Sequence, residues 1–215
     1  MILIYIKMED INQSNTRTQY DFYLLIYNIQ SRHNVGTLIR SASAFKCKKI
    51  LVLGTDKKVL KKFFGNQGTV KKMEFVYFNT VEEVKQFCKD NDIFICGVEI
   101  CENSVPVHKQ PFKGNTLFVL GNEGAGMNKK QKEMCDQLVY IPQYSTKTGS
   151  LNVAIAGSII FHHFAIFANY KEADFTNEKY NVEYQNFQNK NLYNNEADKC
   201  VESSELDAYN NQMEN

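Results

Sequence analysis

Three polar stretches of the chain, each following an apolar run, hold the residue types best suited to chemistry. A guanidinium presents a planar fork of donors to a phosphate or a developing oxyanion, and glycines let a backbone come close to a ligand. A carboxylate, amides and hydroxyls stand beside the arginine and the glycines. The candidate reactive side chains are Asn34, Arg40, Glu123, Ser150 and Asn152.

The last of these stretches combines the end of a strand, a polar loop and the start of an apolar helix. Pro142 stops the strand because proline cannot donate a ladder hydrogen bond. Ser150 is the predicted N-cap of the helix over 151–168, and Asn152 is a second capping candidate. A helix N-terminus at the carboxyl end of a strand favours polar ligands, so we predict the active site at this junction.

Apolar runs of strand length alternate with helical patterns along the rest of the chain. This order predicts an α/β fold in which helices flank a mostly parallel sheet of about five strands. Asn34 is a candidate cap for the first helix, and Thr80 with Glu83 forms a capping box for a later one. The expected strands are 23–27, 49–54, 93–100, 116–120 and 137–141, and residues 73–78 show period-two character. One expected helix begins at Val35, and the others span 81–91, 128–137 and 151–168.

Composition limits the class of protein. The 215 residues are 43% hydrophobic, as expected for one folded domain. Four lysines and ten acidic residues lie beyond residue 170, so the body of the chain is basic although the net charge is only +1. A basic body suits a polyanion such as RNA, and is also ordinary for a protein surface. We therefore predict a flexible extension over 1–21, a catalytic domain over 22–170 and an acidic, Asn-rich, partly disordered tail over 171–215.

Cysteine and histidine spacing argues against a metal site. The six cysteines include no C-x-x-C pair and no zinc-like spacing with histidine, which indicates reduced thiols in an intracellular, cytoplasmic protein. His162 and His163 are expected to be structural, whereas His33 adjoins Asn34 and is a candidate RNA contact. The apolar segment 151–168 is too interrupted to predict a membrane span. It is also too apolar for one small domain to cover, which predicts a homodimer.

The patterns N-x-G-x-x-x-R at 34–40, G-N-E-x-x-G at 121–126 and I-P followed by S-L-N-V-A at 141–154 resemble a known set of motifs. They are similar to those of the SpoU (TrmH-type) branch of the SPOUT superfamily, the S-adenosylmethionine-dependent RNA ribose 2′-O-methyltransferases. The resemblance covers about 23–168. It implies a C-terminal trefoil knot, S-adenosyl-L-methionine as methyl donor with S-adenosyl-L-homocysteine as product, a homodimer, no metal, and tRNA ahead of rRNA as substrate.

The resemblance also assigns roles to residues. Arg40 is expected to hold the substrate phosphate and hydroxyl and to stabilise the alkoxide, since an arginine is too basic to act as a general base. Glu123 faces either the donor's positive charge or Arg40, and Asn34, Ser150 and Asn152 complete the catalytic set. Residues that the resemblance places on the donor are Glu99, Ile100, Leu120, Gly121, Asn122, Gly124, Ile141, Gln143, Tyr144, Ser150 and Leu151.

The loop 143–149 departs from the family pattern, since Gln143 and Ser145 stand where many relatives have Met and Gly. Two other functions remain open from the sequence. Other SPOUT branches methylate a base nitrogen, and a non-catalytic RNA-binding module could keep the same fold.

Overall fold

The computed structural model describes residues 19–54, 69–176 and 179–180. The chain divides after Tyr170 into two compact units, residues 1–170 and 171–215. In the second unit, β8 (Phe175–Thr176) and β9 (Lys179–Tyr180) form a short antiparallel hairpin. The predicted extension over 1–21 and tail over 171–215 lie for the most part outside the described residues.

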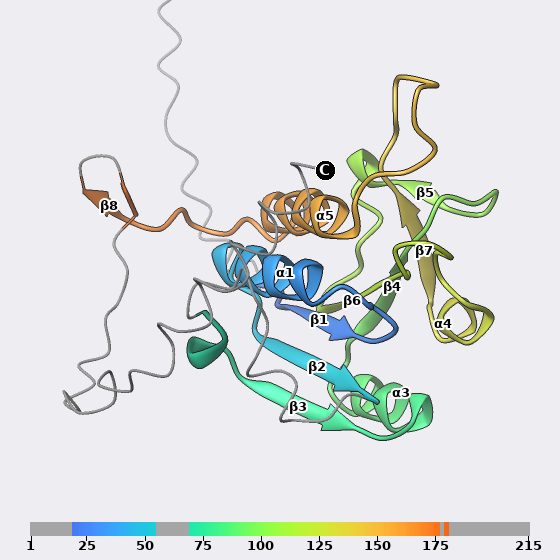
Figure 1. The fold of residues 1–215 in the computed structure, drawn as a ribbon. Coiled ribbons are helices and arrows are strands. Elements are labelled where there is room, and N and C mark those ends of the chain that lie inside the picture. The colour runs from blue at the N-terminus through green and yellow to red at the C-terminus, as the bar shows by residue number, and fades with distance from the viewer. Residues whose placement is uncertain (1–18, 55–68, 177–178, 181–215) are drawn as a thin grey trace, which may run out of the picture. The chain divides into compact units, whose positions relative to one another are not determined.

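A parallel sheet of seven strands forms the centre of the first unit, in the order β3-β2-β1-β6-β4-β7-β5 (Figure 1). Every neighbouring pair in it is parallel, which confirms the predicted α/β class. The strands are β1 (Phe22–Ile26), β2 (Lys49–Leu53), β3 (Phe75–Phe78), β4 (Phe94–Val98), β5 (Val105–Pro106), β6 (Thr116–Leu120) and β7 (Gln137–Tyr140).

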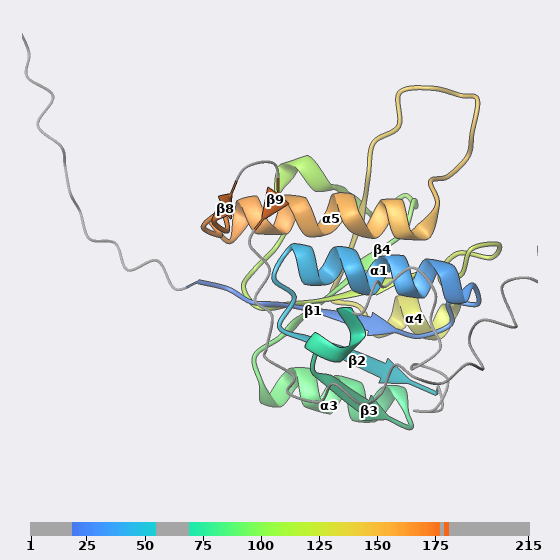
Figure 2. The same cartoon turned by 60° about the vertical axis from the view of Figure 1, so that its left-hand side comes forward.

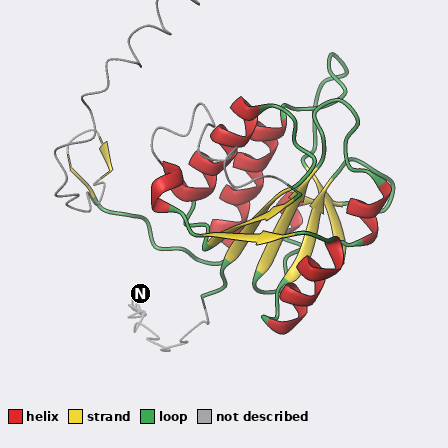
Figure 3. Cartoon of the chain, turned by 60° about the horizontal axis from the view of Figure 1, so that its bottom comes forward, coloured by secondary structure: helices red, strands yellow, loops and turns green. Residues whose placement is uncertain are grey.

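Helices cover both faces of this sheet, as Figure 3 shows. One core joins the even-numbered residues of β1 to α1 and α5, and a second joins its odd-numbered residues to α3 and to Met127 and Met134, which flank α4. Because both faces are covered, β1 and β6 are buried along their whole length and read as continuous apolar runs. The helices are α1 (Arg32–Ala44), α3 (Val81–Asp90), α4 (Lys129–Glu133) and α5 (Val153–Phe167), with 3-10 turns η1 (Thr69–Lys72) and η2 (Val107–Lys109).

Helices α1 and α5 run side by side on one face (Figure 2). Gly157 permits their close approach, because a Cβ there would lie 2.4 Å from Cδ2 of Leu38. Ser158 Oγ and Ser41 Oγ are 2.8 Å apart across the same contact. No helix in the described ranges has the length and apolar character needed to cross a membrane.

The predicted cap of α1 was wrong, and of the two candidate caps of α5 the second, Asn152, is the cap. The N-cap of α1 is Ser31, whose Oγ accepts from Asn34 N, so Asn34 lies inside the helix. The N-cap of α5 is Asn152, whose Oδ1 accepts from Ala154 N at 2.8 Å, so Ser150 lies outside the helix. In both cases the chain offers two good capping residues close together, and the local sequence does not choose between them.

Three other bounds differ from the prediction. Helix α4 ends at Glu133 because Gln137 already belongs to β7. The predicted loop 101–114 contains β5, whose two residues are too few to show a strand period. Thr80 caps α3 as predicted, but the Glu83 carboxylate accepts from Asn79 N, one residue before the cap.

Candidate functional site

A cavity of about 440 Å³ lies where β4, β6 and β7 end. Its volume is within the range of small-molecule sites, roughly 300–1,000 Å³. The walls come from three segments that follow these strands, 98–100, 120–126 and 140–151, and from the first turns of α5. Every residue that the resemblance assigns to the donor lines this cavity except Tyr144, which is 94% exposed.

The loop 121–126 is a tight structure that its glycines make possible. Backbone N–H groups of Asn122 and Gly126 each donate to the other residue's carbonyl at 2.9 Å. Asn122 Oδ1 accepts from Gly124 N at 2.9 Å and from Ala125 N at 3.1 Å. A Cβ on Gly121 would lie 2.5 Å from the backbone carbon of Gly126, so only glycine fits there. The cavity therefore has one wall of closely packed backbone.

Asn34, Glu123 and Asn152 meet in one hydrogen-bond network. Asn34 Nδ2 donates to Glu123 Oε1 at 3.0 Å, and Asn34 Oδ1 accepts from Asn152 Nδ2 at 3.1 Å. The Asn34 residue is only 8% exposed. Since each residue comes from a different motif, the network fixes the three stretches relative to one another.

The Glu123 carboxylate also binds the loop that precedes α1. It accepts from Gln30 N at 3.1 Å and from Ser31 N at 3.0 Å. Burial raises the pKa of the Glu123 carboxyl, but hydrogen bonds from Asn34, Gln30 and Ser31 lower it by more, so the pKa lies below its ordinary value of 4.5. The carboxylate thus stays charged at neutral pH and holds the start of α1.

Arg40 and Ser150 lie outside this network. Arg40 is on the exposed face of α1, and makes no hydrogen bond or ion pair with the described part of the chain. Six residues separate it from Asn34, which corresponds to about 9 Å along a helix axis. Ser150 is exposed and lines the cavity. The guanidinium is therefore free to meet a ligand at the surface.

Two further residues at the site, Asn28 and Gln131, were not predicted from the sequence. Gln131 is fully buried, and its Nε2 donates to Leu120 O at 2.9 Å at the end of β6. Its Oε1 accepts from Asn28 Nδ2 at 3.2 Å and from Asn128 N at 3.0 Å. Asn128 and Gln131 have the spacing of a capping box, so the sequence could have indicated the bond between Asn128 N and Gln131 Oε1.

Asn28 adopts the left-handed conformation with φ of 62°. Its carbonyl accepts from Asn122 Nδ2 at 3.1 Å. A second line of amides, from Gln131 through Asn28 to Asn122, thus connects α4 and the end of β1 to the loop 121–126. The positive φ is accessible to asparagine at little cost, and orients this carbonyl toward the loop.

Glu99 holds the far end of the loop 121–126. Its Oε2 accepts from Met127 N at 3.0 Å, and its Oε1 lies 3.2 Å from Lys132 Nζ. The Glu99 side chain remains 20% exposed and lines the cavity. It can therefore accept a hydrogen bond from a ligand while it restrains the loop.

The titratable groups elsewhere offer no second reactive centre among the described residues. No group of three His, Cys, Asp or Glu there could hold a metal ion. Burial raises the pKa of the Cys88 and Cys135 thiols to about 12, and raises those of Cys47 and Cys96 further. Such thiols stay protonated at neutral pH and are poor nucleophiles.

The comparisons with known proteins agree with the motifs. A model of the SpoU rRNA Methylase family matches residues 21–162. The chain is 26% identical over 163 residues to the 23S rRNA (guanosine-2′-O-)-methyltransferase RlmB of Acinetobacter baylyi, covering 72% of this chain and 63% of that protein. It is 32% identical over 143 residues to the 23S rRNA (guanosine(2553)-2′-O)-methyltransferase RlmP of Bacillus subtilis, covering 65% and 56%. The chain thus spans about 60% of the length of such relatives.

Solved structures share the fold. The SpoU methyltransferase AviRb of Streptomyces viridochromogenes is similar with a TM-score of 0.60 and 25% identity, over 69% of this chain and 60% of that one. Its complex with the cofactor AdoMet gives a TM-score of 0.62 at 24% identity, over 76% and 63%. Membership of one family accounts for both the sheet order and the three motifs. The resemblance seen in the sequence is confirmed: the chain belongs to the SpoU rRNA methylase family.

Proposed function

We propose that the protein transfers a methyl group from S-adenosyl-L-methionine to a ribose 2′-oxygen of RNA, with S-adenosyl-L-homocysteine as product. The network of Asn34, Glu123 and Asn152 beside the cavity carries this proposal, because it assembles all three motifs at one place. Relatives named as guanosine-2′-O-methyltransferases of 23S rRNA, and others named as tRNA/rRNA methyltransferases, support an RNA substrate. Either RNA class is compatible with these names.

The cavity suits the donor in shape and in chemistry. The backbone of the loop 121–126 forms one wall, and a side chain on Gly121 would collide with that loop. Ile100, Leu120 and Leu151 add apolar surface for a base, and the Glu99 carboxylate adds an acceptor for a hydroxyl. The donor supplies a methyl group on a positively charged sulfur. The residues of these walls would hold the donor in the cavity, and this would place its methyl group for attack by the acceptor.

Arg40 is proposed to act on the acceptor. Its exposed guanidinium can hold an RNA phosphate in its planar fork and stabilise the negative charge that develops on the 2′-oxygen. Asn34 and Glu123 fix the start of α1, and Arg40 lies farther along the same helix. Ser150 is proposed to contact the ligands from the cavity wall.

The charges around the cavity favour a polyanion. Helices α1 and α5 and the loop between β7 and α5 contain no acidic residue. Arg32, His33 and Arg40 are exposed on α1. Among the nearby carboxylates, Glu99 is paired with Lys132, and Glu123 is bound to the α1 loop. Little negative charge thus opposes an incoming RNA backbone.

A homodimer, a C-terminal trefoil knot and action in the cytoplasm are also proposed. On α5, Ile155 and Ile166 are 52% and 54% exposed, and Leu151 just before it is 37% exposed. Ile155 and Ile166 lie about three turns apart on the same side of α5, and a second copy would cover the apolar stripe that they form with Leu151. Similarity to SpoU structures supports the knot. The path of the chain also supports it, because the chain pairs β7 with the far side of β4 and then comes back to pack α5 against α1.

The test separates the proposed function from its two rivals. The purified protein is titrated calorimetrically with S-adenosyl-L-methionine, then assayed for transfer of a labelled methyl group to unmodified tRNA and rRNA transcripts. Donor binding and transfer that stops when the target ribose is 2′-deoxy would support the proposal. Equal methylation of the deoxy substrate identifies a base-nitrogen enzyme, and no heat with the donor identifies a non-catalytic binding module.

A further inference from the structure

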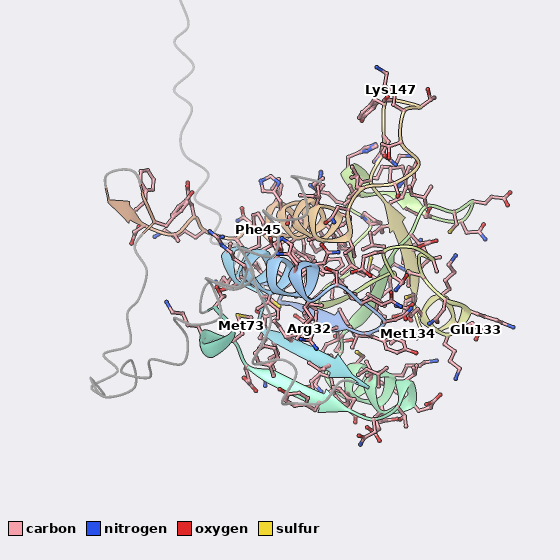
Figure 4. All side chains as sticks on the ribbon, in the orientation of Figure 1. Arg32, Phe45, Met73, Glu133, Met134 and Lys147 are labelled. Atoms are coloured by element: carbon pink, nitrogen blue, oxygen red, sulfur yellow. The ribbon has the colours of Figure 1, made fainter. Side chains whose placement is uncertain are left out.

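The loop 143–151, between β7 and α5, exposes an aromatic ring and a lysine beside the cavity. The Tyr144 residue is 94% exposed, and no described residue makes a hydrogen bond or ring contact with its side chain. Lys147 stands at the tip of the loop, which extends away from the sheet (Figure 4). No acidic residue occurs between 141 and 152. A tyrosine this exposed contributes nothing to the core, and its ring is free to contact a ligand.

Hydrogen bonds within the loop give it a defined shape. Gln143 Nε2 donates to Gly149 O at 3.5 Å across the base of the loop. Nearer the tip, Lys147 N donates to Ser145 Oγ at 3.2 Å, and Thr148 Oγ1 donates to Ser150 O at 3.0 Å. Gln143 and Gly149 also line the cavity, so Tyr144 lies one residue from the cavity wall.

We infer that this loop binds the RNA acceptor, with the Tyr144 ring stacked on an unpaired base next to the target nucleotide and Lys147 on a phosphate. The inference rests on the proposed function. The exposed Tyr144 ring can stack only on a base that is not already stacked within an RNA helix. Aromatic rings replace the lost stacking for any base, and a nearby cation binds the backbone. The substrate class is then a single-stranded segment or loop of RNA.

The structure favours RNA over the two other candidate ligands of this loop, which are the methyl donor and a second copy of the chain. Tyr144 is absent from the cavity lining, although the sequence resemblance placed it on the donor. Apolar side chains suit a second copy of the chain. They lie on α5 at Ile155 and Ile166, and just before it at Leu151, rather than along the polar residues 143–149. An aromatic ring with a lysine and no carboxylate matches nucleic acid best.

Four variants test the inference: Tyr144→Ala, Tyr144→Phe, Lys147→Ala and the control Lys113→Ala. Lys113 lies over the ring of Phe94, at the amino end of β4 and hence at the opposite edge of the sheet. Binding is measured by anisotropy with a labelled tRNA transcript that lacks modifications, over a range of salt concentrations. Donor affinity without RNA and the light-scattering mass are measured for each variant.

Tyr144→Ala is expected to weaken RNA binding about 5- to 150-fold, the range for loss of one stacked base, while Tyr144→Phe stays within about twofold of wild type. Lys147→Ala should reduce the salt slope by about one unit, and Lys113→Ala should leave it unchanged. Donor affinity and mass should not change.

Wild-type affinity for RNA in Tyr144→Ala would overturn the inference and leave the proposed function standing. A weaker donor affinity in that variant would place Tyr144 in the donor site instead, and a lower mass would place it in a subunit contact. If the wild type neither binds RNA nor transfers a methyl group, the proposed function itself fails.

Discussion

Replacing Asn34 with aspartate tests the central network, because it changes one donor atom and almost no volume. In the native protein, Asn34 Nδ2 donates to Glu123 Oε1 at 3.0 Å. In Asn34→Asp an oxygen takes the place of this nitrogen. Two carboxylates then face each other at about the same distance. The other contact, from Asn152 Nδ2 to Oδ1 of residue 34, can remain.

The expected loss of stability combines a lost hydrogen bond and a repulsion. A hydrogen bond to a charged group contributes about 1.5–3 kcal/mol. Two unit charges about 3 Å apart repel by about 5 kcal/mol at an effective dielectric constant of 20, and by about 1.4 kcal/mol in water. Glu123 is exposed, so the value nearer water applies. We expect the free energy of unfolding at pH 7 to fall by about 3–4 kcal/mol.

The pH dependence gives the sharper test. In the wild type the pKa of Glu123 is lowered, so its stabilisation is full above the ordinary value of 4.5 and is lost as pH falls through the folded-state pKa. In Asn34→Asp the two carboxyls raise the pKa of the pair, so one proton bound on acidification restores a donor between them. Between pH 7 and pH 5 the variant should therefore gain stability while the wild type does not.

Urea denaturation at half-unit pH steps measures both curves. Asn128→Asp is the matched control, because Asn128 uses only its side-chain oxygen, which accepts from Gln131 N, and its amide nitrogen makes no comparable bond within the described residues. Aspartate caps a helix as well as asparagine does, so this control should keep wild-type stability at pH 7. Parallel curves for Asn34→Asp and wild type would refute the proposed role of the Asn34–Glu123 contact.

Substitutions at four further positions probe the rest of the site. Arg40→Ala should reduce methyl transfer at least about 100-fold with donor affinity within about twofold, and Arg40→Lys should also be poor because an ammonium lacks the bidentate fork, as single-turnover kinetics and calorimetry would show. Gly121→Ala should abolish donor binding by calorimetry, because the new Cβ would lie 2.5 Å from loop backbone. Gln131→Met should lower the free energy of unfolding by about 1–3 kcal/mol in urea, since the buried carbonyl of Leu120 loses its donor. Ile155→Glu should convert a dimer to a species near the chain mass of 24.8 kDa by light scattering, because it places a charge in the exposed apolar stripe.

The sheet was predictable because its strands are buried on both faces. Continuous apolar runs such as those of β1 and β6 carry a strong signal, and the alternation with helices implied parallel pairing. The two-residue β5 had no such signal, since its pairing with β7 depends on a partner distant in sequence. The spatial strand order was equally outside the reach of a local pattern.

The motifs located the site residues without giving their contacts. The sequence placed Glu123 opposite either the donor or Arg40, whereas its hydrogen bonds go to Gln30, Ser31 and Asn34. These partners lie about 90 residues away along the chain, so only the fold brings them within reach. Gln131 was not predicted, because the sequence of a short polar helix does not indicate that one of its side chains is fully buried.

The starts of both helices are connected to the network of Asn34, Glu123 and Asn152. Asn34 lies inside α1 and uses its amide for the network, while Ser31 caps the helix. Asn152 does both tasks, since its Oδ1 caps α5 and its Nδ2 donates to Asn34. The start of α5 is thereby bonded to the first turn of α1, and the contact of Gly157 with Leu38 sets how closely the two helices pack. The position of Arg40 on α1 therefore depends on α5 packing as well as on its own motif.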